Sequence, residues 1–138
     1  MTEARVETLI DTVAWVHIVQ GRILCGRPAG KDVFFIPGGK REGDETDLQT
    51  LVREIEEELT VRLRPETVRH VGTYEAPAQV PPNGVTVRMS CYTAEYEGTL
   101  TPSSEIAETA WFTAADRALV PPVDQLLFDE LVGRELLS

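Results

Sequence analysis

Cysteine, basic residues and long apolar runs are scarce in this sequence, and each shortage excludes a class of protein. The two cysteines, Cys25 and Cys91, stand in apolar contexts without CxxC or Cys/His spacing, which predicts buried, reduced thiols and no cysteine-based metal or redox motif. The 13 lysines and arginines are outnumbered by 23 acids, and a net charge of −10 argues against a phosphate-neutralising surface for nucleic acid polymers. A polyanionic substrate would therefore need a bridging metal ion.

The sequence also shows no pattern typical of a targeting signal or a membrane-spanning segment. The first eleven residues carry acids throughout and no apolar core, and the apolar run at 13–19 is short and interrupted by His17. We expect a cytoplasmic protein without a membrane anchor. The length of 138 residues, without repeats or low-complexity segments, predicts a single domain over residues 1–138.

The most informative stretch begins with a helix signal. Thr46 as N-cap and Gln49 three residues later have the form of a capping box, and Asp47 suits the positive end of the helix dipole. Apolar residues then recur at three-and-four spacing and predict one core-facing stripe, formed by Leu48, Leu51, Val52, Ile55 and Leu59. The sequence therefore predicts a helix that begins near Asp47.

Three glutamates share a second face of this helix. Glu54, Glu57 and Glu58 are neighbours at a helical spacing, and like charges at this spacing destabilise an isolated helix by a few tenths of a kcal/mol per pair. A Glu-rich face is most often solvated surface. A hard divalent cation would remove the repulsion, because Mg²⁺ prefers oxygen ligands from one or two carboxylates, water and substrate phosphates. Both interpretations are open on this evidence alone.

A longer pattern favours the metal-binding interpretation. Over the 23 residues from 39 to 61, the chain resembles the Nudix hydrolase signature at every defined position but one. The matching residues are Gly39, Glu45, Arg53, Glu54, Glu57, Glu58 and the apolar Val61. The exception is Thr60, where the family has glycine, and a β-branched residue is unfavourable at the positive φ of a helix C-cap. We expect this departure to change how the helix ends rather than what it binds.

The resemblance implies roles for the acids and the arginine. In similar enzymes the residues at Glu57 and Glu58 hold Mg²⁺, or Mn²⁺ in its place, and Glu54 matches a third acid that acts as metal ligand or general base. Divalent ions neutralise and orient a pyrophosphate and lower the pKa of the attacking water. Arg53 is expected to hold acidic side chains in position with Glu45 as its partner; the alternative is an ordinary surface ion pair worth under about 1 kcal/mol.

Further ligands are expected outside the helix. The Gly38 carbonyl matches a backbone metal ligand, and similar proteins often draw one more acid from a loop before a late Trp-containing strand. Glu105, six residues before Trp111, is the candidate, with Glu108 next; each could equally be loop surface. For phosphate binding the candidates are a turn glycine and two basic residues, the latter more often ordinary solvated charges: Gly39, Arg27 and Lys40.

The fold implied by the resemblance is an α/β/α sandwich with a mixed β-sheet. Residue patterns agree with it, predicting strands at 13–19, 22–26, 33–36, 68–75, 85–95 and 110–112, and helices at 47–59 and 123–136. Glycines at 38 and 39 predict a loop between strand and helix, and residues 76–84 a proline-rich loop that cannot be a central strand.

The resemblance implies an enzyme that hydrolyses a pyrophosphate bond in a nucleoside diphosphate linked to a moiety X. The small size favours a MutT-like nucleoside triphosphatase with a small-molecule nucleotide as partner. One alternative is an ADP-ribose or nucleotide-sugar pyrophosphatase, because Pro77 lies sixteen residues beyond Val61. Another is a non-catalytic nucleotide-sensing module, although the retention of all three helix glutamates favours catalysis. Dimers are common among similar proteins, so a homodimer is also expected.

Overall fold

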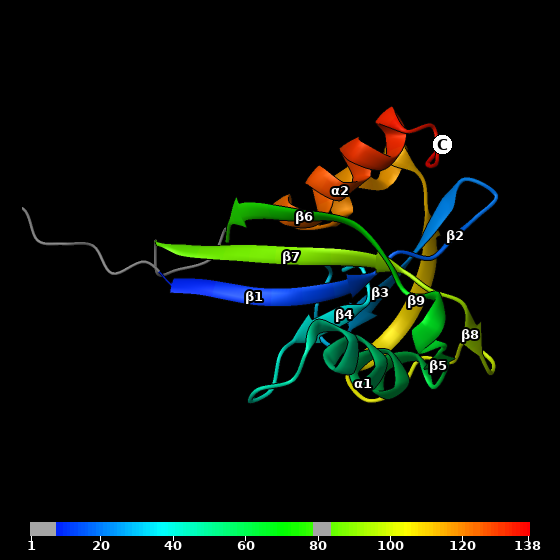
Figure 1. Ribbon diagram of the computed structural model, residues 1–138. Coiled ribbons are helices and arrows are strands. Elements are labelled where there is room, and N and C mark those ends of the chain that lie inside the picture. Colours follow the sequence, from blue (N-terminus) through cyan, green and yellow to red (C-terminus); the bar gives the residue numbers. More distant parts are fainter. Residues whose placement is uncertain (1–7, 79–83) are drawn as a thin grey trace, which may run out of the picture.

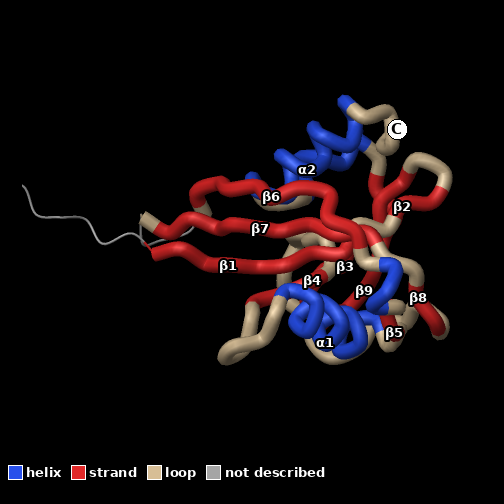
Figure 2. The backbone as a smooth tube through the Cα atoms, in the orientation of Figure 1, coloured by secondary structure: helices blue, strands red, loops and turns tan. Residues whose placement is uncertain are grey.

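The computed structural model describes residues 8–78 and 84–138. Its larger sheet has four strands in the order β4-β1-β7-β6, namely β4 (Gly38–Lys40), β1 (Thr8–Trp15), β7 (Val85–Thr93) and β6 (Arg69–Pro77). β1 and β7 are parallel, whereas β1–β4 and β6–β7 are antiparallel. The predicted mixed sheet is confirmed, and Figure 2 shows its long central strands side by side.

A smaller antiparallel sheet extends the structure, in the order β2-β3-β9. Its strands are β2 (Ile18–Val19), β3 (Arg22–Pro28) and β9 (Ile106–Phe112), and a two-stranded pair is formed by β5 (Arg62–Leu63) and β8 (Tyr96–Glu97). Two 3₁₀ helices, η1 (Pro65–Thr67) and η2 (Ala114–Leu119), connect these elements.

Helices α1 (Asp47–Leu59) and α2 (Pro122–Gly133) lie on opposite sides of the larger sheet (Figure 1). The predicted α/β/α sandwich is therefore confirmed. Alternate residues of β1 serve the two layers, since side chains along a strand point to opposite faces. Val13 and Trp15 pack in the core with α1, whereas Ala14 packs in the core with α2.

Two strand predictions were wrong. The run 13–19 is divided between β1 and β2, which belong to different sheets, because the chain turns at Gln20 and Gly21, both with positive φ (52° and 75°), and pairs β2 with β3. The run 33–36 makes only one isolated bridge, between Phe35 and Gly26. Pro37 follows this run and has no N–H to extend a ladder. The glycine-rich segment expected as a loop instead forms β4, which pairs with β1.

Other boundaries agree to within a few residues, with some differences. β9 begins earlier than predicted, α2 ends at Gly133, and Leu48, assigned to the core stripe, is 38% exposed because it lies in the first turn, beyond the edge of the packed face. The proline-rich loop predicted at 76–84 begins later than expected, because β6 continues to Pro77 at the edge of the sheet, and its residues 79–83 lie outside the described residues. Cys25 and Cys91 are buried free thiols, as predicted. Among the described residues, no helix has the length and apolar character needed to cross a membrane.

Candidate active site

The N-terminus of α1 is fixed by contacts on both sides. The predicted capping box is present, with the Thr46 hydroxyl accepting from Gln49 N and the Gln49 side chain accepting from Thr46 N. Asp47 accepts hydrogen bonds from Arg41 and from the Tyr92 hydroxyl of β7, the latter at 2.5 Å. The start of the helix is therefore tied to the sheet as well as to its own cap.

Arg53 is the centre of the loop-to-helix contacts. Its Nε and Nη2 donate to the two carboxylate oxygens of Glu45 at 2.8 and 2.9 Å, which confirms the predicted pair as a two-pronged contact. Its Nη1 donates to Glu54 Oε1 at 3.0 Å, and Nη2 also donates to the Lys40 carbonyl at 3.2 Å. The hydrogen bond from Arg53 lowers the pKa of Glu45 to about 2. One guanidinium thus joins the loop, β4 and the acidic face of α1.

Glycine is required at two successive positions of β4 for different reasons. A Cβ added to Gly39 would lie 2.4 Å from Glu54 Cδ, so the Glu54 carboxylate rests directly against this backbone. Gly38 has a φ of 153°, and a Cβ there would lie 1.9 Å from the Val13 carbonyl oxygen of the neighbouring strand. The two glycines therefore allow β4 to approach both the acidic face of α1 and β1.

Glu58 is the buried one of the three helix glutamates Glu54, Glu57 and Glu58. It is 6% exposed, and its Oε2 has no hydrogen-bond partner among the described residues. Burial raises its pKa to about 9, and the nearby Glu54 and Glu105 act in the same direction. Burial also raises the pKa of Glu54, although Arg53 opposes this effect. An unpartnered buried carboxylate oxygen is costly, which marks Glu58 as a candidate ligand rather than a packing residue.

Glu57 differs from the other two helix acids. Its side chain is 53% exposed and makes only a 3.5 Å contact with Arg53 Nη1. Within residues 8–78 and 84–138, no three acidic, histidine or cysteine side chains converge as a metal-binding group. A Mg²⁺ ion nevertheless needs only one or two protein carboxylates besides water and phosphate oxygens. The orphaned Glu58 oxygen next to Glu54 fits that requirement.

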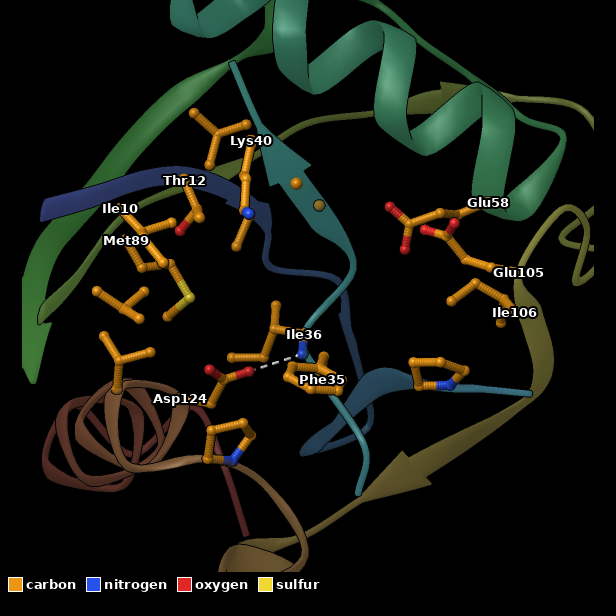
Figure 3. A pocket seen from close by; sticks show the side chains of 18 residues that line it. Ile10, Thr12, Phe35, Ile36, Lys40, Glu58, Met89, Glu105, Ile106 and Asp124 are labelled. Atoms are coloured by element: carbon orange, nitrogen blue, oxygen red, sulfur yellow. Dashed lines mark hydrogen bonds between the residues drawn. The ribbon is translucent and has the colours of Figure 1, made fainter. Parts of the chain in front are cut away.

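A pocket of about 320 Å³ opens beside these acids. Gly38, Gly39, Lys40, Glu58 and Glu105 line one part of it, and Figure 3 shows the Glu58 and Glu105 carboxylates next to each other. The structure thus brings five of the sequence-predicted residues to one cavity. Their roles as metal or phosphate ligands stay predictions.

Arg27 and Glu108 lie apart from this pocket. Arg27 Nε donates to Glu108 Oε1 at 2.7 Å, and its Nη1 donates to the Lys31 carbonyl at 2.9 Å. Neither side chain is part of the pocket lining. Of the two late acids considered from the sequence, Glu105 is therefore the better placed to be a metal ligand. Arg27 is engaged in contacts with Glu108 and Lys31 rather than facing the pocket.

Asp124 was missed by the sequence reasoning. It lies in the first turn of α2, where an aspartate is expected simply from the helix dipole, so no sequence signal distinguished it. In the structure it is 3% exposed, lines the pocket, and accepts a hydrogen bond from Ile36 N at 2.8 Å (Figure 3). Burial raises its pKa to about 7.

Comparisons with known proteins bear on the whole of this site. A family model described as NUDIX domain matches residues 10–129, a range that contains every site residue named above. A search of curated protein sequences finds no match.

Several solved structures are similar. The solution structure of the E. coli ORF135 protein has 27% identity and a TM-score of 0.73, with 94% of this chain and 92% of that chain covered. A MutT NUDIX hydrolase from Burkholderia pseudomallei has 20% identity and a TM-score of 0.73, with 91% and 99% covered. A bifunctional NMN adenylyltransferase/ADP ribose pyrophosphatase from Francisella tularensis, complexed with AMP and a Mn ion, has 19% identity and a TM-score of 0.68, with 95% and 43% covered. The last two likenesses support the fold alone.

Proposed function

The chain belongs to the NUDIX family, and from this premise we propose that it is a Mg²⁺-dependent pyrophosphohydrolase of nucleoside diphosphates linked to a moiety X. The substrate favoured by the proposal is a nucleoside triphosphate, cleaved to a monophosphate and pyrophosphate in the MutT-like manner. Mn²⁺ is the alternative metal ion. A cytoplasmic location, the absence of nucleic acid polymers as partners, and a homodimer stay predictions from the sequence.

One observation carries this proposal, the unpartnered oxygen of Glu58 at the edge of the pocket. A buried carboxylate oxygen without a hydrogen-bond donor lowers the stability of the folded protein. If Glu58 had only a structural role, a hydrophobic side chain at this position would give a more stable protein. Glu54 lies beside it, and Glu105 and the Gly38 backbone line the same cavity. These are all oxygen donors, the set that a hard divalent cation prefers.

The residues would divide the work as follows. Glu58, Glu57, Glu105 and the Gly38 carbonyl would hold Mg²⁺, which when bound neutralises the pyrophosphate and lowers the pKa of the attacking water. Glu54 can accept a proton from that water or serve as a ligand, and Arg53 holds its Oε1 at 3.0 Å. Glu45 fixes Arg53 in turn through its two-pronged contact. Lys40 and the Gly39 backbone would face the phosphates.

The pocket dimensions support a small substrate. A volume of about 320 Å³ is near the lower end of ligand sites, which range from about 300 to 1,000 Å³. This favours one nucleoside with its phosphates over a dinucleotide-like compound such as ADP-ribose. ADP-ribose is nevertheless tested as a second substrate, because the similar Francisella tularensis protein is named as an ADP ribose pyrophosphatase.

The test is metal-dependent turnover of a defined panel. The purified protein is mixed with MgCl₂ and nucleoside triphosphates, ADP-ribose or nucleotide sugars, and the released monophosphate, pyrophosphate or phosphate is measured. We expect turnover that EDTA abolishes, and a loss of two or more orders of magnitude in kcat for Glu57→Gln, which removes a ligand charge while preserving shape. Glu56→Gln, an exposed neighbour, is the matched control. Nucleotide binding without any turnover would support the sensing-module alternative instead.

A further inference from the structure

The C-terminal end of α1 is capped by the loop that carries Glu105. The last carbonyl groups of a helix have no partners within it and need donors from elsewhere. Thr101 N donates to the Leu59 carbonyl at 2.9 Å, and Ser103 N donates to the Glu58 carbonyl at 2.9 Å. The loop before β9 is therefore hydrogen-bonded to Glu58, the residue whose side chain lies next to Glu105 in the pocket (Figure 3).

The far end of this loop is fixed as well. Ser104 has a positive φ of 56°, and Ile106 N donates to the Ser103 carbonyl at 3.1 Å, which closes a turn around Ser104 and Glu105. Ala29 N, just beyond β3, donates to the Glu105 carbonyl at 2.8 Å. The position of the Glu105 carboxylate is thus determined by a loop that is held between the end of α1 and the end of β3.

Thr60 lies where the helix meets this loop. It is the C-cap of α1 in the left-handed conformation, with φ 59° and ψ 23°. Its Oγ1 lies 2.6 Å from the Leu59 carbonyl oxygen, 3.3 Å from that of Thr101 and 3.4 Å from that of Thr99. The Thr99 carbonyl also accepts from the Thr101 hydroxyl at 3.0 Å. Three carbonyl oxygens therefore surround the one proton that Thr60 can donate, and the glycine of the family pattern would offer no such donor.

We propose that Thr60 is a positioning residue for Glu105. Its hydroxyl holds the segment 99–101 against the end of α1 and thereby sets the distance between the Glu105 and Glu58 carboxylates. The inference rests on the proposed function, because these two carboxylates are among the ligands proposed for the divalent cation. Residues that support a metal ligand from behind change metal affinity when they are replaced.

Loss of the hydroxyl should weaken metal binding while the fold is retained. The three carbonyl oxygens around Oγ1 carry partial negative charge and would repel one another, so the segment 99–101 would move away from the helix end. Glu58 would stay in place because it belongs to α1, whereas Glu105 would move with the loop. The backbone hydrogen bonds from Thr101 and Ser103 would still connect the loop to the helix.

Two substitutions remove the hydroxyl with opposite effects on the backbone. Thr60→Val keeps a β-branched side chain at the positive φ, whereas Thr60→Gly relieves the positive φ; Thr60→Ser keeps the hydroxyl. The affinity for Mn²⁺ is measured without nucleotide from the EPR signal of the free ion, a readout that does not depend on turnover. We expect Thr60→Val and Thr60→Gly each to weaken Mn²⁺ binding by about threefold to tenfold, the range that one ordinary hydrogen bond spans. Thr60→Ser should bind Mn²⁺ as wild type does.

A double-mutant cycle with Glu105→Gln separates positioning from a general loss of structure. In the Glu105→Gln background, Thr60→Val should leave Mn²⁺ affinity unchanged, because the ligand that Thr60 positions is gone. Thr67→Val is the matched control. It removes a hydroxyl that donates to the Arg64 carbonyl at 2.7 Å, in a segment that does not line the pocket next to Glu58, and it should bind Mn²⁺ as wild type does.

The outcomes separate this inference from the proposed function. Wild-type Mn²⁺ affinity in folded Thr60→Val and Thr60→Gly, or an equal loss for Thr60→Val with and without the Glu105 carboxylate, would overturn the role of Thr60 while leaving the metal site intact. A wild-type protein with neither Mn²⁺ binding nor Mg²⁺-dependent turnover would contradict the proposed function itself. If Thr60→Val does not fold, Thr60→Gly and its own cycle with Glu105→Gln decide alone.

Discussion

Replacing Glu58 by glutamine should stabilise the metal-free protein and abolish its activity. The pKa of Glu58 is raised from 4.5 to about 9, first by burial and then by Glu54. A carboxyl group whose pKa rises on folding contributes stability that is complete below the unfolded pKa, and this contribution is lost as the pH rises through the folded pKa. Glu58 therefore destabilises the folded protein progressively as the pH rises from 4.5 to about 9.

The size of the effect follows from the same shift. Each pH unit inside the window costs about 1.4 kcal/mol of unfolding free energy, so the loss reaches about 3 kcal/mol at pH 7. Glutamine keeps the shape and removes the ionisation, and its N–H₂ group can donate to the nearby Glu54 carboxylate. For a domain of this length, a gain of about 3 kcal/mol corresponds to a rise in Tm of roughly 10 °C.

The assay is thermal unfolding in EDTA at pH 5, 7 and 8.5, followed by circular dichroism. The gap between Glu58→Gln and wild type should widen with pH, while Glu56→Gln, exposed on the same helix, should follow wild type. Added Mg²⁺ should raise the Tm of wild type more than that of Glu58→Gln, because binding to the native state stabilises by mass action. Equal pH profiles for both proteins, or activity within twofold of wild type, would refute the reasoning.

Three further substitutions test the surrounding shell. Gly39→Ala should reduce kcat at least tenfold with the fold retained by circular dichroism, because the added Cβ would lie 2.4 Å from Glu54 Cδ and must displace that carboxylate. Arg53→Lys should lower both Tm and kcat, since lysine cannot reproduce the two-pronged contact with Glu45; equal kinetics would contradict the positioning role. Thr60→Gly should change the unfolding free energy by less than about 1 kcal/mol, because relief of the positive φ of 59° is offset by chain entropy and lost hydroxyl contacts.

The parts predicted well from the sequence are local. The capping box at Thr46 and Gln49 involves residues three apart, and the Arg53–Glu45 pair joins residues eight apart. Helix periodicity and a fixed motif specify such contacts directly. The expected change at the end of the helix was wrong by contrast, because Thr60 adopts the left-handed φ of 59° that a glycine C-cap would adopt and its N–H donates to the Glu56 carbonyl.

The parts that could not be predicted depend on distant contacts. Asp124 acquires its significance from Ile36, 88 positions away, and from a burial that the ordinary composition of the α2 first turn does not indicate. The run at 13–19 was divided because Ile18 pairs with Ile23 of a different sheet. Short apolar runs specify that a segment is buried, but the partner strand is decided by the whole fold.

The difference between local and distant contacts also explains why Glu54, Glu57 and Glu58, on one face of α1, have three different environments. Arg53 donates to Glu54 Oε1 at 3.0 Å, so its positive charge is paired with that carboxylate. Glu58 lies one turn further in, where β4 approaches closely enough to bury it and no guanidinium reaches it, while Glu57 turns outward to solvent. Periodicity places all three on one ridge, but the close approach at Gly38 and Gly39 decides which oxygen is left without a partner. The proposed binding of a divalent cation therefore depends on that remaining oxygen rather than on the number of acids.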